Sequence, residues 1–240
     1  MAIEVFNRYE IKYIISDEQF NHILKVLEEY MNPDFYNKDG KPYQICNLYL
    51  DTEKDEFITE SLEKPVYKEK LRIRSYGIVT PKDEVFLEIK KKYKGLVNKR
   101  RTGLYYSDVS NFFQNGTVQE SPLINPQVIS EISYVMKRRP VVPKVFISYE
   151  RFAFFEKNDD DFRLTFDRNI ISRRKNLSLS EEIYGDPLLK DGVYLMEAKA
   201  WKTFPIWFAR LLSENKIFPV SFSKYGYEYT QYRKAVNHIV

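Results

Sequence analysis

The sequence predicts an α+β protein built on an eight-stranded antiparallel β-barrel that is closed into a tunnel, with helices flanking it. Three observations lead to this fold: eight segments with strict alternation, helical patterns between some of them, and charges that recur on one face of each segment. Alternation with a period of two is typical of strands whose two faces meet different surroundings. The eight predicted strands are 3–14, 43–51, 67–76, 84–92, 97–105, 144–155, 161–170 and 193–200.

Helical spacing of apolar residues lies between these strands and after the last one. Ser16 and Gln19 have the pattern of a capping box, which marks a helix start, ahead of Phe20. Further helices are predicted over 125–138, over 204–215 and from Tyr227 into His238. Because the 240-residue chain has neither an internal repeat nor a linker rich in glycine or serine, we expect a single domain over residues 1–240.

Composition excludes several classes of protein. Hydrophobic residues make up 43% of the chain and aromatic residues 16%, which is too many for a disordered chain. With 38 Lys and Arg against 34 Asp and Glu, the net charge is +4, so bulk charge does not indicate nucleic acid as a partner. Cys46 is the only cysteine, which excludes an internal disulfide. Without a signal-peptide pattern or a long apolar run, we expect a cytoplasmic protein with no membrane span.

The charged residues of the predicted strands gather on one face of each strand. Residues two apart point to the same side, and the opposite sides carry apolar residues such as Ile11, Leu71 and Ile89. If helices cover the apolar sides, the charged sides face the barrel interior, where burying an unpaired ion costs several kcal/mol. The interior must therefore hold water, counterions or a polyanion. The charged faces are Arg8, Glu10 and Lys12; Lys70, Arg72 and Arg74; Glu88, Lys90 and Lys92; Lys99 and Arg101; Tyr149 and Arg151; Arg163 and Asp167; Glu197 and Lys199.

Nine motifs in one order give the chain a family resemblance. They are RYEIKY (8–13), NLYLDT (47–52), KLRIRSYG (70–77), FLEIKKK (86–92), KRR (99–101), SYERFAF (148–154), FRLTFD (162–167), LMEAK (195–199) and SFSKY (221–225). With these motifs the chain resembles the vacuolar transporter chaperone (VTC) polyphosphate polymerase domain, within the triphosphate tunnel metalloenzymes of the CYTH-like superfamily. The resemblance implies a tunnel that binds a nucleoside triphosphate, uses Mn²⁺ or Mg²⁺, and transfers the terminal phosphoryl group to polyphosphate.

The resemblance and the charged faces together give a set of candidate site residues. We expect catalytic roles for Lys12, Arg72, Arg74, Lys90, Arg151, Arg163, Lys199 and Lys224. Substrate binding is expected of Arg8, Lys99, Arg101, Tyr149 and Ser223, and metal binding of Glu197, Glu10 and Glu88. Hard carboxylate oxygens suit Mg²⁺ or Mn²⁺. Phosphoryl transfer mainly needs positioned cations and a divalent ion, and these residue types supply both requirements.

Structural alternatives exist for several of these residues. Glu10 and Glu88 could serve only to order neighbouring arginines, and Glu197 could form an ion pair with Lys199. Lys224 could be a solvent-exposed lysine in a strand end or loop. The basic run at 90–101 would ordinarily indicate a nucleic-acid patch or a hairpin turn, and we interpret it as part tunnel wall and part solvated turn.

Two positions depart from the pattern of the related enzymes. The hydrolytic tunnel enzymes open with Glu-x-Glu-x-Lys, whereas this chain has Arg8 in the first place, as the VTC branch does. A cation there removes a ligand for a second metal ion, which would activate water, so transfer is favoured over hydrolysis. Ser221 stands where the family's polymerases can carry a lysine, which lowers the expected affinity for the acceptor chain.

The leading hypothesis is therefore a metal-dependent polyphosphate polymerase that uses ATP or another triphosphate and acts on polyphosphate. One alternative is a triphosphate or nucleoside triphosphate hydrolase on the same tunnel. Another is a non-catalytic module that binds polyphosphate or inositol polyphosphates. We expect no nucleic-acid partner, and because no membrane span is expected, recruitment to a membrane would require a membrane partner. The sequence pattern indicates no particular oligomeric state.

Overall fold

The computed structural model of the protein describes residues 9–37, 39–94, 96–157, 162–201 and 203–237. The chain forms two compact units. Unit 1 consists of Met1–Gln44, Tyr149–Ile171 and Pro187–Ser223, and unit 2 consists of Ile45–Ser148, Ser172–Asp186 and Lys224–Val240. Three long strands contribute residues to both units: β3 (Tyr43–Asp51), β7 (Val142–Glu156) and β8 (Arg163–Arg173).

Unit 1 is built on β1 (Tyr9–Ser16) and β10 (Val193–Ala200), which pair in antiparallel register. The strand order is β11-β1-β10-β8-β7, where β11 is Pro219–Val220. Two short strands extend this arrangement: β2 (Met31–Pro33) pairs with β7, and β9 (Asp186–Pro187) pairs with β8. One face of these strands is apolar and the other carries the charged residues described below.

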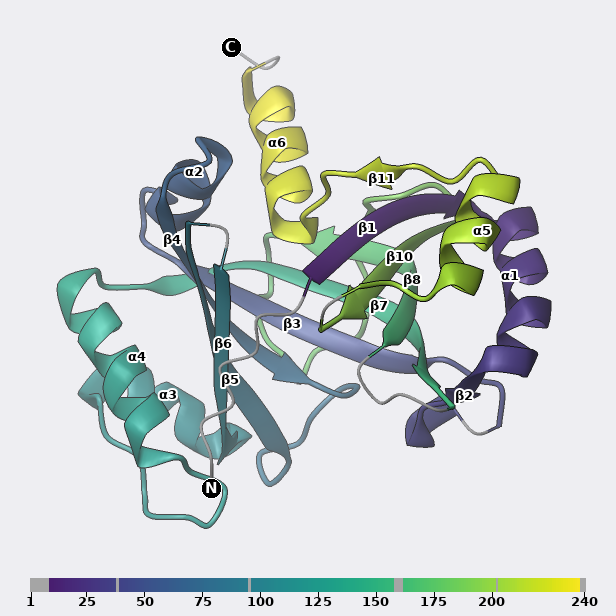
Figure 1. The fold of residues 1–240 in the computed structure, drawn as a ribbon. Coiled ribbons are helices and arrows are strands. Elements are labelled where there is room, and N and C mark those ends of the chain that lie inside the picture. The colour runs from purple at the N-terminus through teal and green to yellow at the C-terminus, as the bar shows by residue number, and fades with distance from the viewer. Residues whose placement is uncertain (1–8, 38, 95, 158–161, 202, 238–240) are drawn as a thin grey trace. The chain divides into compact units, whose positions relative to one another are not determined.

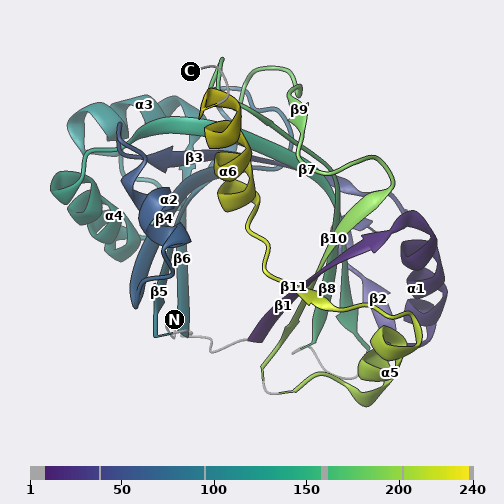
Figure 2. The same ribbon diagram turned by 90° about the horizontal axis from the view of Figure 1, so that it is seen from above.

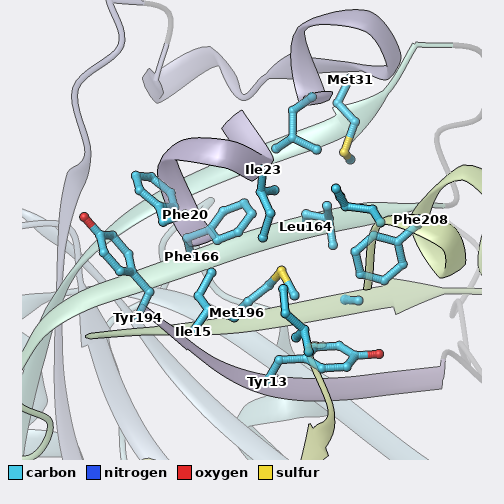
Figure 3. Close-up of a cluster of buried hydrophobic side chains, with 14 of the residues drawn as sticks. Tyr13, Ile15, Phe20, Ile23, Met31, Leu164, Phe166, Tyr194, Met196 and Phe208 are labelled. Atoms are coloured by element: carbon cyan, nitrogen blue, oxygen red, sulfur yellow. The ribbon is translucent and has the colours of Figure 1, made fainter. Parts of the chain in front are cut away.

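Helices α1 (Asp17–Tyr30) and α5 (Ile206–Glu214) cover the apolar face of unit 1 (Figures 1 and 2). The predicted capping box is present, because the Gln19 amide donates to Ser16 Oγ at 3.2 Å and the Ser16 amide donates to Gln19 Oε1 at 3.0 Å. Beneath the helices, Phe20 stacks on Tyr194 with ring centroids 4.1 Å apart (Figure 3). A short 3₁₀ helix, η1 (Phe35–Asn37), follows β2.

Unit 2 continues the antiparallel pairing in the order β7-β3-β4-β5-β6, with β4 at Tyr67–Ser75, β5 at Glu84–Tyr93 and β6 at Leu96–Tyr105. Helices α3 (Tyr106–Asn115) and α4 (Pro126–Arg138) pack on one face of these strands (Figures 1 and 2). That face is the buried core of the unit, where Leu71, Ile73 and Leu87 meet Ile132 and Val135 of α4. Helices α2 (Glu56–Leu62) and α6 (Lys224–Asn237) complete the unit.

The α+β class with a large antiparallel sheet is confirmed. Each of the eight predicted strand segments contains a strand, although 3–8 lies outside the described residues. Among the pairings of the described residues, the path begins at β11 and ends at β6, so closure into a barrel is not confirmed. The last helix begins at Lys224, three residues before the predicted start, and its predicted end at His238 lies outside the described residues. In the described parts of the chain, no helix is long and apolar enough to cross a membrane.

Candidate functional site

The face of β4, β5 and β6 that is opposite α3 and α4 carries five of the candidate cations: Arg72, Arg74, Lys90, Lys99 and Arg101. The strand register places Arg72 opposite Glu88 and Glu88 opposite Arg101, and the next row joins Lys70, Lys90 and Lys99. Because side chains alternate across a strand, these residues share the side that faces away from α3 and α4. The alternation that predicts the strands therefore also predicts correctly which charged residues share one face of each of these three strands.

Four of these residues form what we call the Glu88 cluster: Arg72, Arg74, Lys99 and Glu88. Arg72 Nη2 and Lys99 Nζ lie 2.6 Å and 2.8 Å from the Glu88 carboxylate, and Arg74 Nη1 lies 4.0 Å from it. Burial raises the pKa of Glu88, but attraction by Arg72, Arg74 and Lys99 outweighs burial and holds that pKa well below its usual range. Glu88 is 2% exposed and stays ionised, so three cations share one negative charge.

Lys99 is the cation of the Glu88 cluster whose protonation is most sensitive to its surroundings. Burial lowers its pKa to about 7, attraction by Glu88 opposes that shift, and repulsion by Arg72 and Arg74 adds to it. The side chain keeps 39% of its surface exposed, and water on that side limits the lowering. An anion placed beside Lys99 would favour the protonated amine, so binding of phosphate and protonation of Lys99 are coupled.

Strand β3 holds the two guanidinium groups in place. Arg72 Nη1 donates to the Tyr49 hydroxyl at 3.2 Å, and Arg74 Nε donates to Asn47 Oδ1 at 3.0 Å. Asn47 is itself fixed, because its Nδ2 donates to the Ile147 carbonyl at 3.1 Å. Sequence reasoning did not assign Asn47 or Tyr49 to the site, although their alternate spacing within NLYLDT (47–52) was an available signal.

The start of α6 lies close to the same part of β3. Lys224 is the first residue of this helix and is only 8% exposed, which excludes the alternative of a solvent-exposed lysine in a loop. Its neighbour Tyr225 stacks on Tyr49 at 4.8 Å and donates its hydroxyl proton to Asp51 at 3.0 Å. Ser223, the preceding residue, is half-buried and belongs to unit 1.

In unit 1, the paired strands β1 and β10 bring two lysines and two glutamates together, and we call these the Glu197 cluster: Glu10, Lys12, Glu197 and Lys199. Lys12 is in register with Glu197, and Glu10 with Lys199. Lys12 Nζ lies 3.4 Å from Glu10 and 3.3 Å from Glu197, while Lys199 Nζ lies 3.7 Å and 3.1 Å from the same two carboxylates. The formal charges of this cluster cancel.

Arg151 lies at the edge of the Glu197 cluster, 4.0 Å from Glu197. Asp167 holds it with two short contacts, at 2.6 Å to Nε and 2.7 Å to Nη2, and its guanidinium lies over the Tyr149 ring at 5.2 Å. Burial lowers the pKa of Arg151, but the charge of Asp167 outweighs that effect and raises the pKa. Asp167 therefore neutralises much of the charge that Arg151 would offer to a phosphate.

The remaining candidates lie at different places. Arg163 is 3.4 Å from Asp34 and over the Phe155 ring at 4.6 Å. Arg101 is exposed and lies over the Phe86 ring at 4.6 Å. Arg8 lies outside the described residues, so its expected role stays a prediction.

The three candidate metal ligands differ in their fit to a hard cation. Within the described ranges, no group of three or more His, Cys, Asp or Glu residues could hold a metal ion. Glu10 and Glu197 nevertheless approach the same two ammonium groups, so both carboxylates already converge on positive charge. Two carboxylates suit Mg²⁺ or Mn²⁺, which complete their coordination with water and substrate oxygens. Glu88, with three cations around it, better fits the ordering role.

Comparison with known families shows to which family the chain belongs. The family model described as the VTC domain matches residues 7–232. The chain belongs to the VTC domain family. No curated protein matches this chain.

Among solved structures, this VTC domain is similar to a proposed adenylate cyclase from Bacillus halodurans, with a TM-score of 0.55 and 14% identity over 92% of this chain and 94% of that one. At this identity the likeness shows a shared fold. This VTC domain also matches the PH1819 protein from Pyrococcus horikoshii OT3, with a TM-score of 0.35 and 12% identity over 87% of this chain and 86% of that one.

Proposed function

We propose that this VTC domain is a metal-dependent polyphosphate polymerase, which transfers the terminal phosphoryl group of ATP to a growing polyphosphate chain in the cytoplasm. In this proposal, residues 1–240 act as one domain, and the charged strand faces line the interior of a closed antiparallel barrel. The single observation that carries the proposal is the Glu88 cluster, where Arg72, Arg74 and Lys99 share one buried carboxylate.

An excess of positive charge at a partly buried site favours a polyanionic ligand. Cations held together out of bulk water repel one another, and a bound phosphate chain relieves that repulsion. Arginine is suited to this task because its planar fork can bind two phosphate oxygens at once. Arg72 and Arg74 are two residues apart on β4, about 6.6 Å, so each can bind a different phosphate group of one chain.

The Glu197 cluster supports the metal-dependent part of the proposal. Glu10 and Glu197 would hold Mg²⁺ or Mn²⁺, which would neutralise negative charge on the phosphate oxygens when bound. The same carboxylates position the ammonium groups of Lys12 and Lys199, which can donate hydrogen bonds to phosphate. Arg151 adds a guanidinium that Asp167 fixes in direction.

Transfer rather than hydrolysis is favoured by the Arg-x-Glu-x-Lys pattern of the first strand. Arg8 replaces a carboxylate that could hold a second metal ion, so an activated water is less available as a nucleophile. A phosphate group of the growing chain, held by the cations of the candidate site, would then be the nucleophile.

The test is to incubate the purified chain with ATP and Mn²⁺, to resolve polyphosphate on a gel and to assay free phosphate. Long chains with release of ADP are the expected result. Free phosphate without long chains would replace the polymerase with the hydrolase. If the chain binds ATP or polyphosphate but forms neither product, a non-catalytic binding module would be the function instead.

A further inference from the structure

The cationic face of unit 2 extends beyond the Glu88 cluster. Pairing of β4 with β5 and of β5 with β6 adds a row of Lys70, Lys90 and Lys99 and then a row of Lys68 and Lys92. We call the cations of this face the cationic ladder. Its members are Lys68, Lys70, Arg72, Arg74, Lys90, Lys92, Lys99 and Arg101, and the same face carries two carboxylates, Glu88 and, at the start of β5, Glu84.

On the opposite face of the same strands, charged residues form ion pairs with residues of α4. There, Glu69 is paired with Arg138 of α4 at 2.8 Å. Lys91 and Arg100 share Glu131 of α4, at 2.6 Å and 2.9 Å. On the helix-covered face, these charged strand residues meet opposite charges on α4. The ladder face instead carries eight cations and two strand carboxylates, Glu84 and Glu88.

The end of the ladder carries an accumulation of positive charge. Lys68 Nζ donates to the Ser61 carbonyl in the last turn of α2 at 3.1 Å, which fixes the ammonium group. Burial lowers the pKa of Lys68, and repulsion by Lys92 and then Lys64 lowers it further. The repulsion indicates that Lys68 lies close to other positive charges. Lys68 is four residues before Arg72 on β4.

The ladder is longer than a triphosphate requires. From Lys68 to Arg74 there are three steps of two residues, which corresponds to about 20 Å of strand. The Glu88 cluster, with Arg72 and Arg74, occupies only one end of this length. We propose that Lys68 and Lys92 form a separate subsite for further phosphate groups of a polyphosphate chain, an inference that rests on the proposed function.

The experiment compares two probes on the full chain: inorganic triphosphate and long-chain inorganic polyphosphate. The test variant is Lys68→Gln with Lys92→Gln, which removes two positive charges and keeps a polar side chain at each position. The matched control is Lys82→Gln with Lys137→Gln, two exposed lysines off the ladder with the same change in net charge. Affinities for both probes are measured over a series of salt concentrations.

We expect the test variant to bind polyphosphate severalfold more weakly, with the slope of log affinity against log salt reduced by about two. Triphosphate binding should stay equal to that of the unchanged chain. Polyphosphate binding equal to that of the control variant would overturn the subsite, and so would an equal loss for both probes. If single-stranded DNA bound as tightly as polyphosphate and lost affinity in the same variant, the ladder would be a general polyanion surface. Failure of the unchanged chain to bind triphosphate would instead overturn the proposed function.

Discussion

Glu88 illustrates how a single buried side chain can hold several cations in fixed positions. It is 2% exposed, and its carboxylate contacts Arg72 and Lys99 directly. An unpaired charge this deeply buried would be costly, so the cations stabilise Glu88 as much as Glu88 orders them. The residue therefore fixes the positions of the cations without cancelling their total charge. If phosphate binds here as proposed, the cations are already ordered before it arrives.

The first prediction concerns the substitution Glu88→Gln. Removing the carboxylate leaves three cations without their shared partner, so we expect the free energy of unfolding to fall by about 2 kcal/mol. Triphosphate should then stabilise the variant more than it stabilises the unchanged chain, because it replaces the lost negative charge. Denaturant unfolding with and without triphosphate measures both effects. The control is Glu131→Gln, which removes the partner of Lys91 and Arg100 on the other face. If its stabilisation by triphosphate increased equally, the special role of Glu88 would be refuted.

The second prediction concerns pH and Lys99. Its pKa is lowered from 10.5 to about 7 in the folded chain, so between these values the unfolded chain binds more protons. This contribution to stability therefore increases as pH rises from about 7 to about 10.5. Affinity for triphosphate should change in the opposite direction, because the neutral amine no longer attracts phosphate. Lys99→Arg keeps the charge at every pH in this range and should flatten the affinity profile between pH 7 and 9. Identical profiles for the two proteins would contradict the assignment.

At the scale of elements, the start of α6 is tied to β3 and α2 by a short hydrogen-bonded chain. Asp51 accepts from the backbone amides of Thr52, Phe57 and Ile58 and from the Tyr225 hydroxyl. Further along α6, Glu228 accepts two hydrogen bonds of 2.7 Å from the guanidinium of Arg174, which follows β8. The first turns of α6, which carry Lys224, are thus held to unit 2 by several independent contacts.

The third prediction is that Tyr225→Phe disturbs substrate binding more than stability. The substitution keeps the ring stacked on Tyr49 but removes the hydrogen bond to Asp51, which should lower the free energy of unfolding by about 1 kcal/mol. Tyr225 follows Lys224 and stacks on Tyr49, whose hydroxyl accepts from Arg72. We therefore expect KM for ATP to rise severalfold with a smaller change in kcat. Tyr229→Phe is the matched control, since it removes a hydroxyl contact with Thr59 one turn along the helix. Equal kinetic effects of the two substitutions would show that Tyr225 has only a structural role.

The long strands could be predicted from the sequence because alternation is a local property. The short strands β2, β9 and β11 could not, since two or three residues show no period. Helix α2 was missed for another reason. Its first turn is capped by Asp51, whose carboxylate accepts from Phe57 and Ile58 across a turn in which Asp55 has φ of 58°. Such a cap lies too far along the chain for the usual N-terminal pattern to reveal it.

The candidate site shows the same division between local and long-range information. Alternation correctly groups Arg72, Arg74 and Lys99 on one side of their strands. It cannot show which carboxylate they share, because that depends on the register of β4, β5 and β6. Likewise, Asp167 was recognised as an inward residue, but its close pairing with Arg151 follows only from the contact of two strands.

At the scale of the whole molecule, charge is divided between two kinds of cluster. The Glu197 cluster of unit 1 has two cations and two carboxylates, and Asp167 matches the neighbouring Arg151. The Glu88 cluster of unit 2 has three cations and one carboxylate. Cations and carboxylates are therefore equal in number in the Glu197 cluster of unit 1, whereas cations outnumber carboxylates in the Glu88 cluster of unit 2. The mild net charge of +4 hides this separation.

The last prediction is that metal and triphosphate binding can be lost separately. Glu197→Gln removes a carboxylate from unit 1, so it should weaken Mn²⁺ binding and abolish metal-dependent turnover of ATP while keeping metal-free triphosphate binding. Arg72→Gln should do the reverse and weaken triphosphate binding at least tenfold, since a charged hydrogen bond contributes about 1.5–3 kcal/mol. Its affinity for Mn²⁺ alone should be unchanged. Calorimetry with each ligand alone, followed by turnover assays, measures the two losses. If either substitution abolished both kinds of binding, the two clusters could not act as separate metal and phosphate sites.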